Sequence, residues 1–153
     1  MKTAGYSGKN LIDKLGYKPG EKVMTIQEPA WFRQFLKHEG VEDTKTLPAD
    51  WLHMFVMDRQ ELEALAGALS FVDVENGIWI SWPKKTSTLL QEHSVSHPNE
   101  IIAGLASPSK EDVPKRISEQ DLRDVILPLG WVDTKVAAID TDWSGLKFLR
   151  RKV

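Results

Sequence analysis

The pattern of apolar and polar residues predicts helices and strands that alternate along the chain. Short apolar runs are typical of buried strands, and apolar residues spaced three or four apart are typical of helices packed on a sheet. The predicted strands are 22–26, 41–47 (a weak edge strand), 51–57, 77–82, 131–140 and 143–151. The predicted helices are 9–15, 30–38, one that begins after Asp58 and one that begins after Ser118. This order predicts a largely parallel, doubly wound α/β sheet that ends in an antiparallel hairpin strand.

The segment between the first strand and the strand at Trp51 limits the size of the sheet. It has 24 residues, 27–50. A crossover with its helix needs at least about 10–12 residues, so at most one extra strand fits there. We therefore expect a shortened sheet of four parallel strands, or one more, with an antiparallel strand from Trp143 to Arg151.

Residues 86–117 interrupt this pattern. They contain several serines, three prolines and mixed charges, which is typical of an irregular insertion. The whole chain, 1–153, is otherwise predicted to form a single domain. The glycine-flanked stretch at 5–8 is predicted either to fold over the edge of the sheet or to be a frayed terminus.

The turn after the first predicted strand lacks the glycines of a phosphate-binding loop. No glycine occurs between Gly20 and Gly40, and Pro29 stands where such a loop offers backbone N–H groups. The side chains of Gln27 and Glu28 are bulky enough to crowd a ligand. The turn therefore predicts a nucleotide-binding scaffold without its usual ligand loop.

The C-terminal hundred residues resemble the second half of a class I, S-adenosylmethionine-dependent methyltransferase fold, which is Rossmann-like. The resemblance rests on the strand at Trp51, the capped helix after Asp58, the strand Gly77–Trp82, the helix after Ser118 and the final hairpin. It implies a shortened fold of this class. The missing glycine loop departs from the pattern, so we expect no cofactor: neither S-adenosylmethionine nor a dinucleotide is bound in the usual way.

Four motifs resemble a bacterial family of about this size, a domain of unknown function. They are Gly-Tyr-Ser-Gly (5–8), Lys-Leu-Gly-Tyr-Lys-Pro-Gly (14–20), Trp-Ile-Ser-Trp-Pro-Lys-Lys (79–85) and Asp-Thr-Asp-Trp-Ser-Gly-Leu-Lys-Phe (140–148). The resemblance implies a bacterial protein in which the insertion at 86–117 is longer than usual. It implies no activity.

Composition and charge exclude several classes of function. Lys and Arg number 20 against 22 for Asp and Glu, so the chain lacks the basic footprint of a nucleic-acid-binding protein. No apolar run reaches the roughly 18 residues of a membrane span, and the N-terminus has no apolar signal region. A cytoplasmic location is therefore expected. The absence of cysteine excludes disulfides, thiolate nucleophiles and Cys-ligated zinc.

The carboxyl ends of the predicted parallel strands are the expected place for a ligand. Lysines there offer charge to an anion, and tryptophans offer a ring on which a planar group can stack. The predicted ligand-binding residues are Trp82, Lys84, Lys85, Asp140, Trp143 and Ser144. The alternative is structural: Pro83 ends a strand, the lysines are solvated and the tryptophans pack against helices.

Other chemistry-bearing residues have simpler explanations. His93 and His97 have the spacing of metal ligands on a helix, but Pro98 follows and no third ligand is evident, so no metal site is predicted. His53 is predicted to be a buried, hydrogen-bonded histidine. No serine lies in a nucleophile motif, and no catalytic residue is assigned.

Two functions from different classes remain. The first is a non-catalytic Rossmann-like domain that binds a small anionic ligand or a protein partner. The second is a small enzyme that acts on an anionic or aromatic metabolite at the same edge of the sheet. The missing glycine loop and the lack of a nucleophile–base pair favour the first.

Overall fold

A computed structural model describes residues 10–69, 72–84 and 117–151. The 5–8 stretch, Lys85, His93 and His97 lie outside the described residues, as does the predicted insertion apart from Ile117. The elements are α1 (Leu11–Leu15), β1 (Lys22–Ile26), α2 (Ala30–His38), β2 (Glu42–Thr44), β3 (Ala49–Phe55), α3 (Arg59–Ala66), β4 (Val74–Pro83), α6 (Glu119–Ile126), the 3-10 helix η2 (Leu127–Leu129), β5 (Trp131–Ala138) and β6 (Trp143–Arg150).

The described strands form one six-stranded sheet in the order β2-β1-β3-β4-β6-β5. The pairs β1–β2, β1–β3 and β3–β4 are parallel, whereas β6 runs antiparallel to both β4 and β5. The segment 27–50 holds one helix and the three-residue edge strand β2. The predicted shortened, mostly parallel sheet with an antiparallel C-terminal strand is confirmed.

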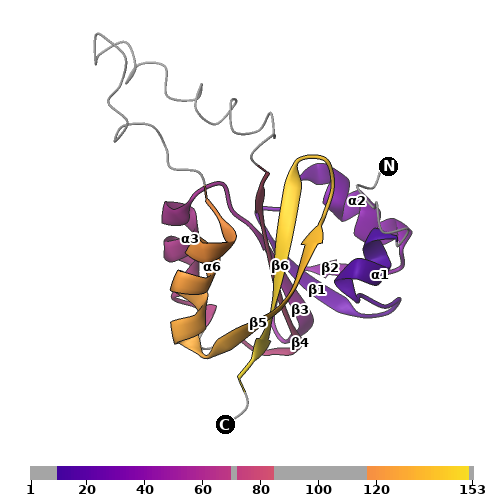
Figure 1. The fold of residues 1–153 in the computed structure, drawn as a ribbon. Coiled ribbons are helices and arrows are strands. Elements are labelled where there is room, and N and C mark those ends of the chain that lie inside the picture. The colour runs from indigo at the N-terminus through magenta and orange to yellow at the C-terminus, as the bar shows by residue number, and fades with distance from the viewer. Residues whose placement is uncertain (1–9, 70–71, 85–116, 152–153) are drawn as a thin grey trace, which may run out of the picture.

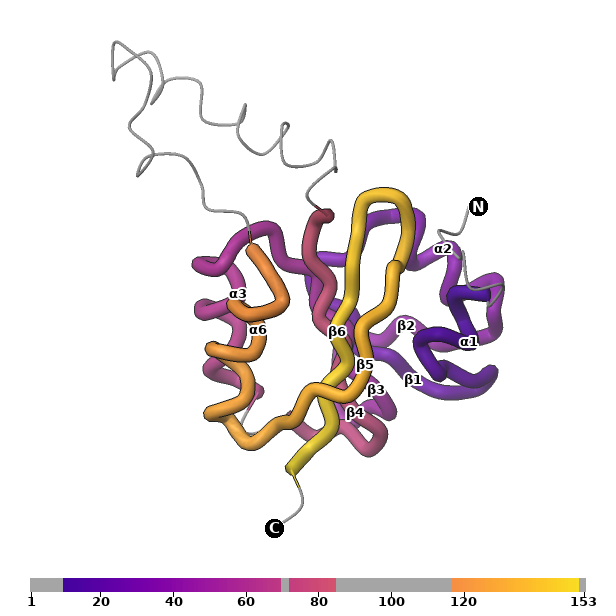
Figure 2. Tube along the Cα trace, in the orientation of Figure 1, coloured from indigo at the N-terminus to yellow at the C-terminus, as the bar shows by residue number. Residues whose placement is uncertain are grey.

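Helices cover both faces of this sheet (Figure 1). The tube in Figure 2 shows α3 and α6 on one side of the strands and α1 and α2 on the other. Because side chains alternate along a strand, β3 sends Leu52 and Met54 towards α3 and α6, and Trp51 and Phe55 towards α1 and α2. These residues belong to two separate apolar cores.

Both predicted helix caps are present. The Asp58 side chain accepts a hydrogen bond from the backbone N–H of Glu61, 2.8 Å away, at the start of α3. At α6, Ser118 and Asp121 form a reciprocal capping box. These carboxylates therefore stabilise helix starts, as the sequence predicts. No helix among the described residues is long and apolar enough to cross a bilayer.

A chain of polar side chains crosses the α1–α2 face of the sheet. The Tyr17 hydroxyl lies 2.8 Å from His53 Nδ1, and His53 Nε2 lies 2.7 Å from the Ser81 hydroxyl. All three side chains are buried. Burial lowers the pKa of His53 to about 3, so the imidazole is neutral at physiological pH. The prediction of a satisfied buried histidine is confirmed, and its burial excludes contact with a substrate.

Candidate functional site

The carboxyl ends of the parallel strands meet at one edge of the sheet, at the top in Figure 1. Gln27 and Glu28 follow β1, Lys45 follows β2, and Lys84 follows β4. The turn that joins β5 to β6 lies at the same edge. Because ligands of open α/β sheets bind at this edge, its side chains form the candidate site.

The loop between β1 and α2 has only three residues and carries backbone strain. Gln27 adopts a left-handed conformation, with φ of 58°, which is costly for a residue other than glycine. Its side-chain amide donates a hydrogen bond to the carbonyl of Phe55, 2.8 Å away at the end of β3. Gln27 thus bridges β1 and β3, the point where the strand order reverses and where a Rossmann-like fold usually opens.

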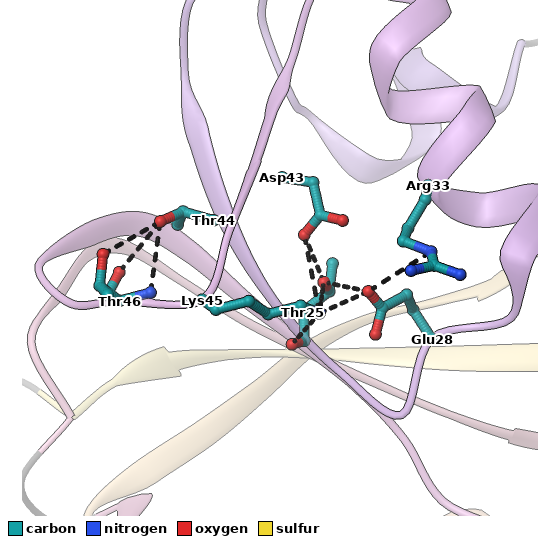
Figure 3. A network of polar contacts seen from close by, with 7 residues as sticks. All are labelled: Thr25, Glu28, Arg33, Asp43, Thr44, Lys45 and Thr46. Atoms are coloured by element: carbon teal, nitrogen blue, oxygen red, sulfur yellow. Dashed lines mark hydrogen bonds and ion pairs between the residues drawn. The ribbon is translucent and has the colours of Figure 1, made fainter.

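A network of polar side chains, here named the β1–β2 cluster, joins the carboxyl ends of these two strands (Figure 3). Its members are Thr25, Glu28, Asp43 and Lys45. The Lys45 ammonium lies 2.7 Å from the Thr25 hydroxyl, 2.9 Å from the Thr25 carbonyl and 2.5 Å from Glu28 Oε2. The Thr25 hydroxyl also lies 2.8 Å from Glu28 and 2.5 Å from Asp43.

The charges within this cluster compensate one another. The Glu28 side chain is only 7% exposed. Burial alone would raise its pKa, but hydrogen bonds from Lys45 and Thr25 outweigh that effect and lower it. The Arg33 guanidinium lies 4.0 Å from the same carboxylate. Glu28 is therefore a paired carboxylate, and the ammonium of Lys45, on a side chain that is 57% exposed, bonds to groups at the carboxyl ends of both strands.

A second feature of the edge, here named the Trp82 hollow, lies between β4, β6 and the start of α6. Its volume is about 450 Å³. The lining residues are Trp82, Pro83, Lys84, Ile117, Ser118, Glu119, Gln120, Arg123 and Ser144. It combines an indole, an ammonium, hydroxyls and the first turn of a helix, which are groups suited to an anionic ligand with a planar part.

The two cations of the hollow differ in their partners. Arg123 lies 2.9 Å from Asp133 and 3.1 Å from Glu119, so two carboxylates already balance its charge. Lys84 is half-buried, its backbone N–H donates to the carbonyl of Asp142, 2.8 Å away, and its ammonium attracts the Asp140 carboxylate without an ion pair among the described residues. Lys84 is therefore the better candidate for contact with an anion.

The structure separates the six residues that the sequence predicts as a site. Trp82 and Ser144 are directly paired across β4 and β6, and with Lys84 they line the hollow. Trp143 packs in the core on the opposite face, with its ring centroid 5.0 Å from that of Phe55. Both tryptophans are 6% exposed. Asp140 lies in the β5–β6 turn, and Lys85 lies outside the described residues.

The Asp140 carboxylate holds the turn between β5 and β6. One of its oxygens accepts hydrogen bonds from the backbone N–H groups of Asp142, at 2.9 Å, and Trp143, at 2.8 Å. Burial raises the pKa of Asp140, whereas these two hydrogen bonds oppose that change. The side chain fixes the backbone at the same edge as the hollow.

Sequence reasoning missed the contributions of Lys45 and of α6. Lys45 belongs to an unremarkable polar stretch, and nothing in its sequence context indicates that it reaches Glu28 across the sheet edge. The α6 residues gave a usable signal, because the helix after Ser118 must begin at the carboxyl edge if β4 and β5 are parallel. Among the described residues, no group of His, Cys, Asp and Glu side chains could hold a metal ion.

The solved structures of similar fold include several methyltransferases and a putative Zn-dependent alcohol dehydrogenase from Rhodobacter sphaeroides, which matches at 12% identity with a TM-score of 0.51, covering 93% of this chain and 89% of that one. One is a magnesium protoporphyrin IX methyltransferase from Synechocystis PCC 6803 with bound SAH, at 13% identity, with a TM-score of 0.52, covering 91% of this chain and 78% of that one. A SAM-dependent methyltransferase from Archaeoglobus fulgidus matches at 16% identity, TM-score 0.51, with 91% of each chain covered. An O-methyltransferase family 2 protein from Planctomyces limnophilus in complex with apigenin matches at 11% identity, TM-score 0.52, covering 98% and 54%.

These similarities establish the fold. The sheet order and the comparisons together identify a shortened, class I methyltransferase-like, Rossmann-like fold, as the sequence predicts. No family model matches the chain. No curated protein matches it either. Function must therefore be argued from the side chains at the edge of the sheet.

Proposed function

We propose that this chain is a methyltransferase-fold domain that binds a small anionic ligand in the Trp82 hollow, and that the β1–β2 cluster, whose charges pair with one another, binds none. The observation on which the proposal rests is the contrast between these two places. At the carboxyl ends of β1 and β2 the charged side chains bond to one another, and at the switch point between β1 and β3 Gln27 bonds to Phe55, whereas Lys84, Trp82 and Ser144 border open volume.

The chemistry of the hollow favours a ligand with a charged group and a planar part. The Lys84 ammonium favours negative charge, whereas the first turn of α6 carries the carboxylates of Glu119 and Asp121 and is already capped. The edge of the Trp82 indole offers an apolar contact, and the Ser144 hydroxyl offers a hydrogen bond. An aromatic carboxylate matches this set of groups better than a bare inorganic anion does.

Titration calorimetry with benzoate and with inorganic phosphate tests the proposal. Lys84→Ala should weaken benzoate binding by at least about tenfold, the effect of losing one charge-assisted contact. Lys22→Ala is the matched control, because this exposed lysine lies at the opposite end of β1. If wild type binds neither probe, or if Lys84→Ala binds as wild type does, the proposed site is wrong.

A second candidate function is a small enzyme that acts on an anionic or aromatic metabolite at the same edge. The similarity to methyltransferases favours it, since proteins of this fold class include enzymes that act on small molecules. Incubation with a metabolite mixture, followed by mass spectrometry, would distinguish the enzyme from the binding domain. Turnover that Lys84→Ala abolishes would support the enzyme, and binding without turnover would support the binding domain.

The glycine-free loop between β1 and α2, with Pro29 at the helix start, leads to a further expectation, that S-adenosylmethionine is not bound in the usual way. Calorimetry with S-adenosylmethionine and SAH tests it directly. Micromolar affinity for either compound in wild type would contradict the proposal. The binding domain could instead bind a protein partner. That would be indicated if no small molecule binds and the chain forms a complex with another protein in solution.

A further inference from the structure

The turn between β5 and β6 is closed by hydrogen bonds on two sides. The N–H of Ile139 donates to the carbonyl of Trp143, 2.9 Å away, which continues the ladder of the hairpin. The Asp140 carboxylate accepts from the N–H groups of Asp142 and Trp143. A side chain that accepts from the backbone two and three residues ahead stabilises a turn in one conformation.

This turn also holds the end of β4. Pro83 pairs with Trp143 in the ladder but has no N–H to donate. The next residue, Lys84, supplies the donor instead, through the hydrogen bond of 2.8 Å from its N–H to the carbonyl of Asp142. The backbone position of Lys84 therefore depends on the conformation of a turn in a different part of the sequence.

We infer that Asp140 is a positioning residue for Lys84: by fixing the β5–β6 turn, it fixes where Lys84 leaves β4 and so directs the ammonium to the Trp82 hollow. The inference rests on the proposed function, in which Lys84 contacts the anion. It gives Asp140 a role that acts through the backbone, beside the attraction between its carboxylate and the Lys84 ammonium, and Asp140 is not among the residues that line the hollow.

Two substitutions separate this role from direct contact with the ligand. Asp140→Asn removes the charge but keeps an oxygen that can accept both N–H groups, whereas Asp140→Ala removes the acceptor. Thr141→Ala is the control, since Thr141 is exposed in the same turn. If Asp140→Ala does not fold, Asp140→Ser, which keeps one weaker acceptor, takes its place.

The first measurement is amide hydrogen exchange at Lys84, which needs no ligand. We expect exchange to be at least about tenfold faster in Asp140→Ala than in wild type, since the loss of two hydrogen bonds loosens the turn. Asp140→Asn and Thr141→Ala should stay within about twofold of wild type. Unchanged exchange at Lys84 in Asp140→Ala would overturn the inference.

The second measurement is benzoate affinity. Asp140→Ala should weaken it about as much as Lys84→Ala does, and Asp140→Asn should restore it to near the wild-type value. Equal loss in Asp140→Asn would overturn the inference, because it would assign the effect to the carboxylate charge. If Lys84→Ala itself has no effect while the exchange result holds, the proposed function fails and the mechanical link between Asp140 and Lys84 remains.

Discussion

The β1–β2 cluster and the Trp82 hollow lie at the same edge of the same sheet, yet they differ in what occupies them. In the cluster, Lys45 satisfies Thr25 and Glu28 from within the chain. In the hollow, Lys84 borders about 450 Å³ of open space. The fold supplies an edge where ligands bind, and individual side chains decide which part of that edge remains open.

The difference reflects how each lysine is placed. Lys45 follows the short edge strand β2, and its ammonium lies near two carboxylates, Glu28 after β1 and Asp43 in β2. Lys84 is held by its backbone at the β5–β6 turn, and its ammonium acts on the Asp140 carboxylate without forming an ion pair among the described residues. Lys45 bonds within the chain, whereas we propose that Lys84 contacts a ligand.

The largest expected effect on stability comes from Trp82, which lines the hollow. Trp82 is 6% exposed and packs in the core, so Trp82→Ala should lower the free energy of unfolding by about 3 kcal/mol. We expect the lower part of the range for such substitutions, because the lost volume joins an existing hollow and leaves no sealed void. Urea unfolding followed by tryptophan fluorescence would measure it. A loss below about 1 kcal/mol would mean that Trp82 is not part of the core.

The next largest effect is the pH dependence of stability that His53 causes; His53 lies in β3, between the two regions. The folded-state pKa of His53, about 3, lies below the unfolded value, so its stabilising contribution is complete above about pH 6.5 and falls as the pH decreases. At pH 5 the loss relative to pH 7.5 should be about 2 kcal/mol, because the unfolded chain binds a proton that the folded chain excludes.

Urea unfolding at both pH values tests this, with substitution of an exposed histidine, His38→Gln, as the control that leaves His53 in place. His53→Asn should lack this component of the dependence. An NMR titration that places the pKa of His53 near 6.5 would contradict the expectation.

A matched pair of substitutions tests the comparison itself. Lys45→Met should lower stability by about 1 kcal/mol, because it leaves the buried carboxylate of Glu28 with fewer partners; the 57% exposure of Lys45 reduces the effect. Lys84→Met should change it by less than about 0.5 kcal/mol. Urea unfolding of both variants measures the two changes. Equal losses in the free energy of unfolding would mean that the two lysines do not differ in their contribution to stability.

The sequence predicts the fold better than the site, for a physical reason. Burial patterns along 22–26, 51–57 and 77–82 are local, and chain length limits the segment 27–50 to one extra strand. The prediction that Trp82 and Trp143 share one site does not take account of the strand register. Trp82 pairs with Ser144 across the ladder, so Trp143, one residue earlier, points to the other face of the sheet. The contact of Lys45 with Glu28 depends on tertiary packing that no local pattern encodes.

The smallest effect is expected at Gln27, which bridges the two strands at the switch point. Gln27→Gly relieves the strain of the left-handed conformation, which is worth about 1 kcal/mol. It also loses the hydrogen bond to Phe55 and adds flexibility to the unfolded chain. Because these effects oppose one another, the free energy of unfolding should change by no more than about 0.5 kcal/mol. Gln27→Ala keeps the strain and loses the bond, so it should cost about 1 kcal/mol. Urea unfolding of the two variants separates strain from bonding. Because Pro29 and the bonds of the β1–β2 cluster stay in place, Gln27→Gly alone should not create binding of S-adenosylmethionine. Calorimetry that detects such binding would show that Gln27, and not the β1–β2 cluster, prevents it.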